Sequence, residues 1–147
     1  MTVRASDGHH SVNAFIVVDD AEQLIGFLAA AFDALECERI DRPDGRIGHG
    51  EVRLGDSIVM VTDASEEFPA RACAHYLYVD DVDLAHERAI ASGATSLREP
   101  ADRFYGNREA AVLDPFGNLW WIASEIEQVS PDEVQRRWEA SGRRSSL

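Results

Sequence analysis

The segment "DPFGNLWWIAS", residues 114–124, carries the clearest structural signal in the chain. Asp114 can bond the backbone that follows it, the next residue is a proline with a fixed negative φ, and Gly117 can take the left-handed conformation that closes a hairpin. The residues after the turn are aromatic and aliphatic, as expected for a strand. Because side chains alternate along a strand, Trp120 and Trp121 must lie on opposite faces. The segment therefore predicts a β-hairpin with one tryptophan on each face of its sheet.

Two halves of the chain repeat one pattern of elements. "AFIVVDDAEQLIGFLAAAF" from Ala14 resembles "HYLYVDDVDLAHERAIASG" from His75, and each reads as a strand, an acidic N-cap and a helix. Two short β-like runs follow in each half, separated by "LGDS" in the first and by "DPFGN" in the second. A further strand is expected between each helix and its hairpin, around residues 36–40 and 95–98. Each half therefore predicts a β-α-β-β-β module.

The end of the chain predicts one more helix. In "VSPDEVQRRWEASG", Ser130 is a suitable N-cap, Pro131 suits the first helical position and Glu133 completes a capping box. Val134 and Trp138 lie one turn apart and are expected to form the buried edge of this helix. The predicted organisation is a single domain over 12–124, made of module one (12–63) and module two (74–124), with a C-terminal helix and tail over 125–147.

The composition is that of an ordinary globular domain, with 147 residues of which 45% are hydrophobic and 28% charged. With 14 Lys and Arg against 27 Asp and Glu, the net charge of −13 disfavours nucleic acid and anionic membranes and favours cations. No apolar stretch is long enough to span a bilayer and no signal peptide is evident, which predicts a cytoplasmic protein. Cys37 and Cys73 lack the spacing of a zinc site or a disulfide framework. His9 and His10 fall in a polar leader that is expected to be frayed and without function.

Together these features resemble the vicinal oxygen chelate superfamily, which includes glyoxalases, bleomycin-resistance proteins and extradiol dioxygenases. The resemblance rests on the two modules, on "VDD" after the first strand of each, on "LGDSIVMVTD" closing the first and on "YGNREAAVLDPFGNLWWIAS" closing the second. The stretches "GRIGHGEVRLGDSIVMVTD", "DRFYGNREAAVLDPFGNLWWIAS" and "VSPDEVQRR" are similar to its PhnB-like branch. The resemblance implies an α+β fold in which two βαβββ modules form a curved, cup-like sheet, usually in a homodimer.

In the enzymes of this superfamily, four side chains inside the cup hold a divalent metal. The resemblance places Asn13, Met60, Ala74 and Trp121 at those positions. They do not form a site for such an ion, which needs imidazole or carboxylate donors. His75 is one residue away from Ala74, but this offset turns it to the opposite face of its strand, toward the helices. The sequence therefore predicts neither metal nor cofactor.

Strand alternation predicts an aromatic lining in place of the metal. The expected ligand-binding residues lie on the strands and in the "DRFYGN" loop, and they are Phe15, Met60, Tyr76, Tyr78, Phe104, Tyr105, Asn107 and Trp121. Such a lining suits a planar or cationic organic molecule. The alternative is that these side chains only fill the cup as a second core.

One histidine and one acid are candidates for catalysis. His49 and Glu51 are two residues apart on an expected strand, so they share a face and could serve as an acid–base pair. They could equally belong to a solvated strand face.

Two functions remain open from the sequence. The first is a metal-independent binding protein of the bleomycin-resistance type, a homodimer that takes a small planar or cationic molecule into its aromatic cup. The second is an enzyme on the same scaffold. It would be an isomerase or lyase that uses His49 and Glu51, or a lyase or dioxygenase whose metal site the four positions do not reveal. A purely structural or partner-binding module has no feature in its favour.

Overall fold

The protein is described by a computed structural model over residues 5–142. Module one consists of β1 (Ala14–Val18), α1 (Ala21–Phe32), β2 (Leu35–Asp41), β3 (Ile47–Leu54) and β4 (Ser57–Asp63). Module two consists of β5 (Ala74–Tyr78), α2 (Val82–Ala91), β6 (Thr95–Asp102), β7 (Asn107–Leu113) and β8 (Leu119–Glu125), and α3 (Pro131–Ser141) follows. The predicted α+β fold of two βαβββ modules is confirmed. No helix within residues 5–142 is long and apolar enough to cross a membrane.

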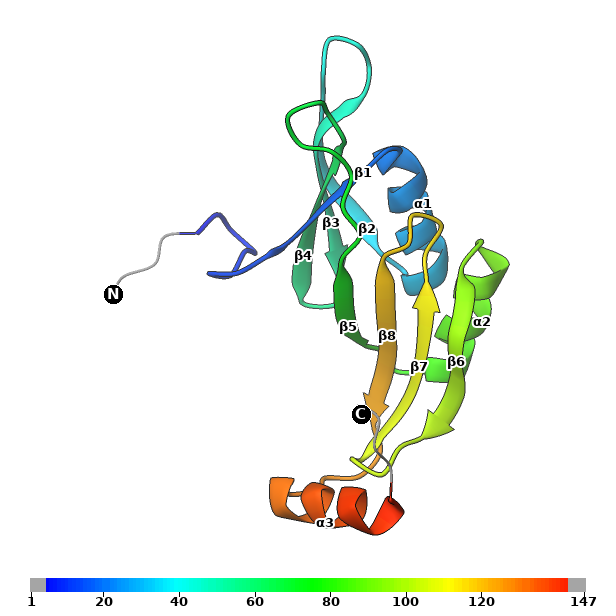
Figure 1. Ribbon diagram of the computed structural model, residues 1–147. Coiled ribbons are helices and arrows are strands. Elements are labelled where there is room, and N and C mark those ends of the chain that lie inside the picture. The colour runs from blue at the N-terminus through cyan, green and yellow to red at the C-terminus, as the bar shows by residue number, and fades with distance from the viewer. Residues whose placement is uncertain (1–4, 143–147) are drawn as a thin grey trace.

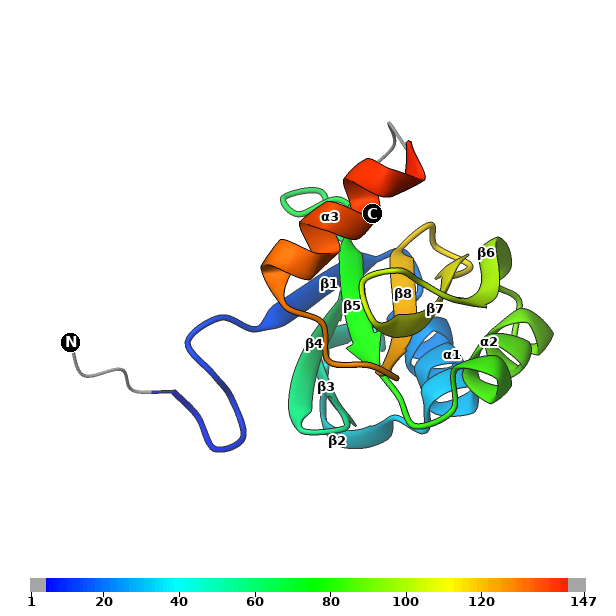
Figure 2. The ribbon, with the colours of Figure 1, turned by 90° about the horizontal axis from the view of Figure 1, so that it is seen from below.

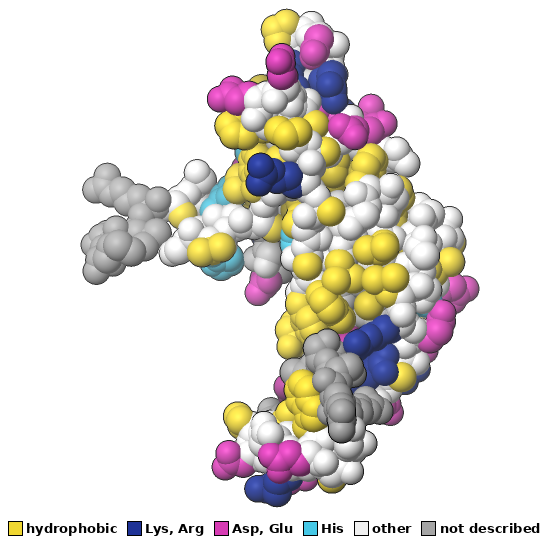
Figure 3. Space-filling view, in the orientation of Figure 1, with side chains coloured by type: hydrophobic (Ala, Val, Ile, Leu, Met, Phe, Trp, Pro, Cys, Tyr) yellow, Lys and Arg dark blue, Asp and Glu magenta, His cyan; other side chains and the backbone are white. Residues whose placement is uncertain are grey.

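The two modules build two sheets of the same topology. The strand orders are β1-β4-β3-β2 and β5-β8-β7-β6, and in each sheet the first pair is parallel while the others are antiparallel. Helices α1 and α2 contact each other and pack on one side of the sheets (Figures 1 and 2). The opposite side, here called the concave face, is hollowed between the N-terminal arm and α3 (Figure 3). The sheets therefore have one face for the core and one for a site.

The helices start where the sequence predicted. The side chains of Asp20, Asp81 and Ser130 each accept a hydrogen bond from the backbone N–H three residues later, at distances of 3.0 to 3.2 Å. These bonds satisfy amide groups that have no partner within their helices. In both modules the second aspartate of "VDD" thus caps the helix that follows the first strand.

The turn between β7 and β8 is organised by the buried carboxylate of Asp114. One of its oxygens accepts bonds from the backbone N–H groups of Phe116 (2.8 Å) and Asn118 (3.0 Å). The other accepts bonds from the Asn118 amide (2.8 Å) and from the indole N–H of Trp120 (3.0 Å). The Asn118 side-chain oxygen in turn accepts a bond from the backbone N–H of Cys73 at 3.1 Å. The turn therefore fixes both the tryptophan after it and the entry to β5.

The two adjacent tryptophans lie on opposite faces, as predicted. Trp120 is 1% exposed in the core, whereas Trp121 is only partly buried. Gly117 has the expected left-handed conformation with φ of 83°. His75 stacks on Trp120 at 4.4 Å between ring centroids, which confirms that it faces the helix layer.

The position of α3 differs from the prediction. Val134 and Trp138 were expected to form a buried edge, but no described residue of α3 is buried. The helix lies at one end of the molecule and not on a sheet (Figure 1). It is attached by ring contact between Trp138 and Phe104 at 5.8 Å, and by Arg137, which donates to the Phe104 carbonyl at 2.9 Å and pairs with Glu127 at 2.8 Å. Helical spacing identified the inner edge of α3, but a single loop does not provide enough surface to bury it.

Truncating the two tryptophans should have different effects on stability. Trp120→Ala removes a large core side chain and should lower the free energy of unfolding by about 3 to 5 kcal/mol. Trp121→Ala should lower it less, because water can fill the space on the concave face. Denaturant titration of both variants measures the difference. A larger loss for Trp121→Ala would contradict the assigned faces.

The bond between Asp114 and the Trp120 indole should be measurable as a coupling energy. Asp114→Asn places an amide where backbone and indole N–H groups need an acceptor. It should therefore lower the free energy of unfolding by about 1 to 3 kcal/mol. Trp120→Phe removes the indole donor, so in a double-mutant cycle the two substitutions should couple by about 1 kcal/mol. Urea unfolding of the wild type, both single variants and the double variant gives this energy. Strict additivity would mean that the bond contributes nothing.

Candidate functional site

Hydrophobic side chains gather on the concave face over β5, β8 and β7 (Figure 3). Tyr76 and Tyr78, which are 45% and 66% exposed, lie edge to face at 5.4 Å between ring centroids. Tyr76 is also nearly parallel to Trp121, with centroids 6.4 Å apart and planes inclined by 23°. We call Tyr76, Tyr78 and Trp121 the aromatic face. These three predicted residues therefore form one exposed surface in module two.

A buried carboxylate that was not predicted from the sequence lies behind the aromatic face. Glu109 on β7 is 2% exposed and accepts hydrogen bonds from the hydroxyls of Tyr76 (2.5 Å) and Tyr105 (2.6 Å). Asn107 donates its amide to the Tyr76 hydroxyl at 2.8 Å, and the Arg98 guanidinium lies 3.9 Å from Glu109. The sequence-predicted Tyr76, Tyr105 and Asn107 are thus joined through Glu109.

Burial and the hydrogen bonds to Glu109 both favour the neutral form of the two phenols. Burial, followed by the hydrogen bond to Glu109, raises the pKa of both Tyr76 and Tyr105 above the ordinary value for tyrosine. Both hydroxyls therefore remain donors to Glu109 at physiological pH. Glu109 stands two residues before Ala111, which pairs with Trp121 and so shares its face, but this pairing is known only from the register of the sheet.

The loop between β6 and β7 positions Tyr105 and Asn107 beside Glu109. Gly106 has φ of 100°, and a Cβ at this position would clash with the carbonyl oxygen of Glu127. Its own carbonyl accepts bonds from the backbone N–H groups of Ile126 and Glu127. The predicted Phe104 lies between the ring of Tyr105, at 5.2 Å, and α3. The tight bend therefore requires a glycine at position 106.

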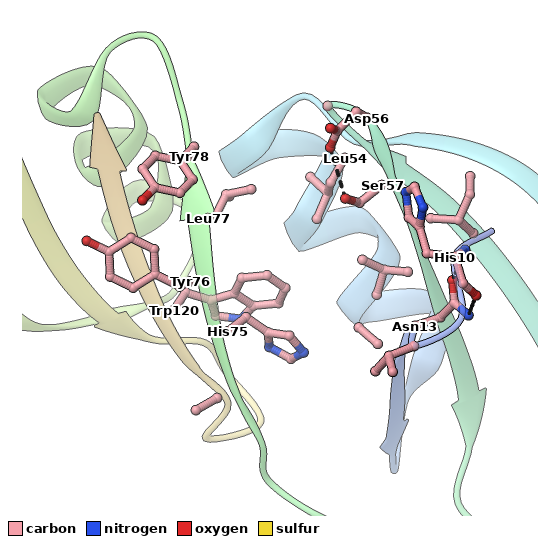
Figure 4. Close-up of a pocket in the computed structure, with 16 residues that line it drawn as sticks. His10, Asn13, Leu54, Asp56, Ser57, His75, Tyr76, Leu77, Tyr78 and Trp120 are labelled. Carbon is pink, nitrogen blue, oxygen red and sulfur yellow. Dashed lines mark hydrogen bonds between the residues drawn. The ribbon is translucent and has the colours of Figure 1, made fainter. Parts of the chain in front are cut away.

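A cleft of about 450 Å³ separates β5 from the β1 and β4 side of module one. Tyr76 and Tyr78 line it from β5, while His10 and Asn13 line it from the segment before β1 (Figure 4). Met60 lines a different cavity of about 430 Å³, and Phe15 a third of about 300 Å³. Within residues 5–142, the eight predicted ligand-binding residues therefore do not share one cavity.

The four residues that the resemblance assigns to the metal positions do not fit a metal. The Asn13 amide is bonded to the backbone of His10, accepting at 2.9 Å and donating at 2.7 Å. Met60 offers a thioether, Trp121 an indole ring and Ala74 a methyl group. None supplies the imidazole or carboxylate donors of such a site.

Module one carries a polar cluster on its concave face. His49 Nε2 lies 2.9 Å from Glu51 Oε1, so the predicted pair does share a face. His9 Nε2 lies 3.0 Å from the same oxygen. The hydrogen bond from His49, together with the charge of His9, holds the pKa of the Glu51 carboxyl below its usual value despite an opposing effect of burial. The expectation of a frayed leader is thus wrong for His9, whose contact with a residue far along the chain leaves no local sequence signal.

His75 packs on Trp120 and lines the cleft between the modules (Figure 4). Burial lowers its pKa, which favours the neutral ring stacked on Trp120. Its Nδ1 atom is buried without a hydrogen-bond partner among the described residues. The position is that of a packing side chain.

Comparison with known proteins agrees with this fold. Residues 9–122 match the family model of the Glyoxalase/Bleomycin resistance protein/Dioxygenase superfamily. An uncharacterized protein of Mycobacterium bovis is 32% identical over 143 residues, covering 90% of this chain and 94% of that protein.

Solved structures show the same architecture at lower identity. TioX from Micromonospora sp. ML1 is 23% identical with a TM-score of 0.65, covering 79% of this chain and all of that one (100%). A variant of the Listeria monocytogenes fosfomycin resistance protein FosX, solved with Mn(II) and 1S,2S-dihydroxypropylphosphonic acid, is 16% identical with a TM-score of 0.59, covering 86% and 94% of the two chains. The chain therefore belongs to the glyoxalase/bleomycin resistance protein/dioxygenase superfamily, the vicinal oxygen chelate proteins.

Proposed function

We propose that the protein binds a small planar or cationic organic molecule on the aromatic face of module two, without a metal at the four family positions. The observation that carries the proposal is the pair of nearly parallel rings of Tyr76 and Trp121, 6.4 Å apart and both accessible. The Tyr76 hydroxyl is held by Glu109 and Asn107, which fixes the ring before any ligand arrives. A preorganised ring loses little conformational entropy on binding.

Electrostatics favour a ligand that carries positive charge. A cation placed over a tyrosine or tryptophan ring is attracted by the negative face of the ring. The buried Glu109 carboxylate adds negative potential behind Tyr76, although Arg98 at 3.9 Å offsets part of it. The net charge of −13 also attracts cations to the protein over longer distances.

We also propose that the protein works as a homodimer. Among residues 5–142, β5 pairs with β8 alone, so its other edge faces the cleft unpaired within its sheet. Val12 (89% exposed), Phe15 and Tyr78 are large apolar side chains exposed near this edge or on β1. Unpaired edges and exposed apolar side chains are commonly covered by a symmetric partner. A second copy would bring the module-one residues Phe15 and Met60 toward a more enclosed site.

A second candidate function rests on the 2.9 Å contact between His49 and Glu51. This pair has the geometry of a general acid and base, so an isomerase or lyase on the same scaffold is the alternative. Recovery of a bound ligand unchanged would support the binding protein. Conversion that is lost in Glu51→Gln would support the enzyme.

Ligand binding should depend on Trp121 and be measurable by fluorescence. A panel of planar aromatic cations, with neutral and anionic analogues of similar size, should show saturable quenching that is strongest for the cations. Trp121→Ala should weaken binding by about 1 to 3 kcal/mol, the range of a buried aromatic or cation–π contact. Leu97→Ala, which removes an exposed apolar side chain from β6, is the control and should change nothing. Equal affinities in wild type and Trp121→Ala would refute the proposed site.

The homodimer should be detectable at micromolar concentration. Sedimentation equilibrium should give a species of twice the 16.3 kDa chain mass. Only the 16.3 kDa species at these concentrations would contradict a dimer while leaving the ligand test unaffected.

A further inference from the structure

The concave face of module one brings four potential metal donors together. Donor atoms of Glu38, His49 and Glu51 all lie within 4.8 Å of one another. His9 stands outside this group of three, but its Nε2 atom lies 3.0 Å from the Glu51 oxygen that His49 also contacts. Two imidazole nitrogens therefore converge on one carboxylate, with a second carboxylate beside it.

An irregularity in β2 is responsible for the second carboxylate. The register between β2 and β3 shifts between Glu36 and Glu38, so that Glu36 pairs with Val52 and Glu38 pairs with Glu51. In a regular ladder Cys37 would stand opposite Glu51. Because paired residues share a face, the bulge places two carboxylates side by side. Like charges in directly opposite positions are destabilising unless a cation lies between them.

The second ring nitrogen of His9 is oriented in the way that metal ligands require. His9 Nδ1 lies 3.2 Å from the backbone carbonyl oxygen of Asp7, which can only accept, so a hydrogen bond there places the hydrogen on Nδ1. In that tautomer the lone pair of Nε2 points at Glu51. A metal ion between Nε2 and the carboxylate would then satisfy both acceptors. A ligating histidine typically donates its other N–H to a carbonyl in this manner.

We propose that His9, His49, Glu51 and Glu38 form a binding site for a divalent transition-metal ion of the zinc class. Imidazole and carboxylate donors suit such ions, whereas magnesium and calcium prefer oxygen ligands alone. Ligands at about 2.1 Å from a tetrahedral ion stand about 3.4 Å apart, so rotamer adjustments of these side chains would close the site. The adjoining cavity of about 430 Å³, which Met60 also lines, would leave room for water or a substrate at the ion.

The four proposed ligands are not the residues at the four family positions, although Asn13 and Met60 line the adjoining cavity, and they lie in the other module from the aromatic face. The site draws its ligands from β2, β3 and the N-terminal arm, and the bound ion would fix that arm on the sheet. It amends the sequence-based expectation that the protein holds no metal. Failure to bind zinc would not count against the proposed ligand site of module two. Failure to bind the aromatic cations would likewise not count against the zinc site.

Calorimetric titration of the full chain, first stripped with a chelator, tests the proposal with ZnCl₂ and MnCl₂. The wild type should bind about one zinc ion per chain. His9→Ala and His49→Ala should each weaken binding about 10- to 100-fold, and Glu38→Gln should weaken it less. Circular dichroism checks that each variant is folded. Since His9 lies on the arm outside both sheets, its variant remains informative if His49→Ala unfolds.

Matched controls separate this site from surface binding. Glu36→Gln removes the same charge from the same strand, but Glu36 pairs with Val52 and bonds Arg39, so zinc affinity should not change. Cys37→Ser excludes a thiolate ligand at the exposed cysteine and should also have no effect. The absorption spectrum of the Co²⁺ form should show nitrogen and oxygen ligation without thiolate bands. Absence of saturable binding, or wild-type affinity in both His9→Ala and His49→Ala, would overturn the proposal.

Discussion

The carboxylate of Asp114 is the constraint on which module two depends. Its two oxygens accept four hydrogen bonds from the turn and from the Trp120 indole, and Asn118 extends the network to the start of β5. The register of β5 and β8 follows, with His75 opposite Trp120 and Tyr76 opposite Trp121. One buried charge in a turn thereby decides which aromatic rings enter the core and which remain on the concave face. Its burial is tolerable because every bond is to a donor that needs an acceptor.

The same topology, used twice, carries two different chemistries. Met60 and Trp121 occupy corresponding places in the two modules. Met60 pairs with a residue of β1 and a residue of β3, and Trp121 pairs with a residue of β5 and a residue of β7. The third-strand partner of Met60 is Glu51, within an imidazole–carboxylate cluster, whereas that of Trp121 is Ala111. The ring of Trp121 remains partly exposed beside this small side chain. The repeated topology therefore gives the concave faces of the two modules the same backbone geometry. Their different side chains give the two faces different chemistry.

The residues that the resemblance assigns to the metal positions have a consistent chemical character. Asn13 bonds to the backbone of His10, Trp121 lies nearly parallel to Tyr76, and Met60 and Ala74 offer no imidazole or carboxylate donor. The polar groups that remain on the concave face are displaced to the second and third strands of module one, and to Glu109 in module two. Superfamily membership therefore accounts for the shape of the protein, while activity depends on these particular side chains.

The sequence by itself determined the features that arise from short-range physics. Turn chemistry predicted the hairpin at Asp114, acidic caps predicted the helix starts, and strand alternation predicted opposite faces for Trp120 and Trp121. Only the tertiary structure brought His9 to Glu51, 42 residues away, and only it revealed the buried Glu109. The physical reason is that such contacts depend on strand order, on a bulge in β2 and on the path of the N-terminal arm. None of these leaves a periodic signal in the residues concerned, so the faces of the strands were predictable and the polar clusters upon them were not.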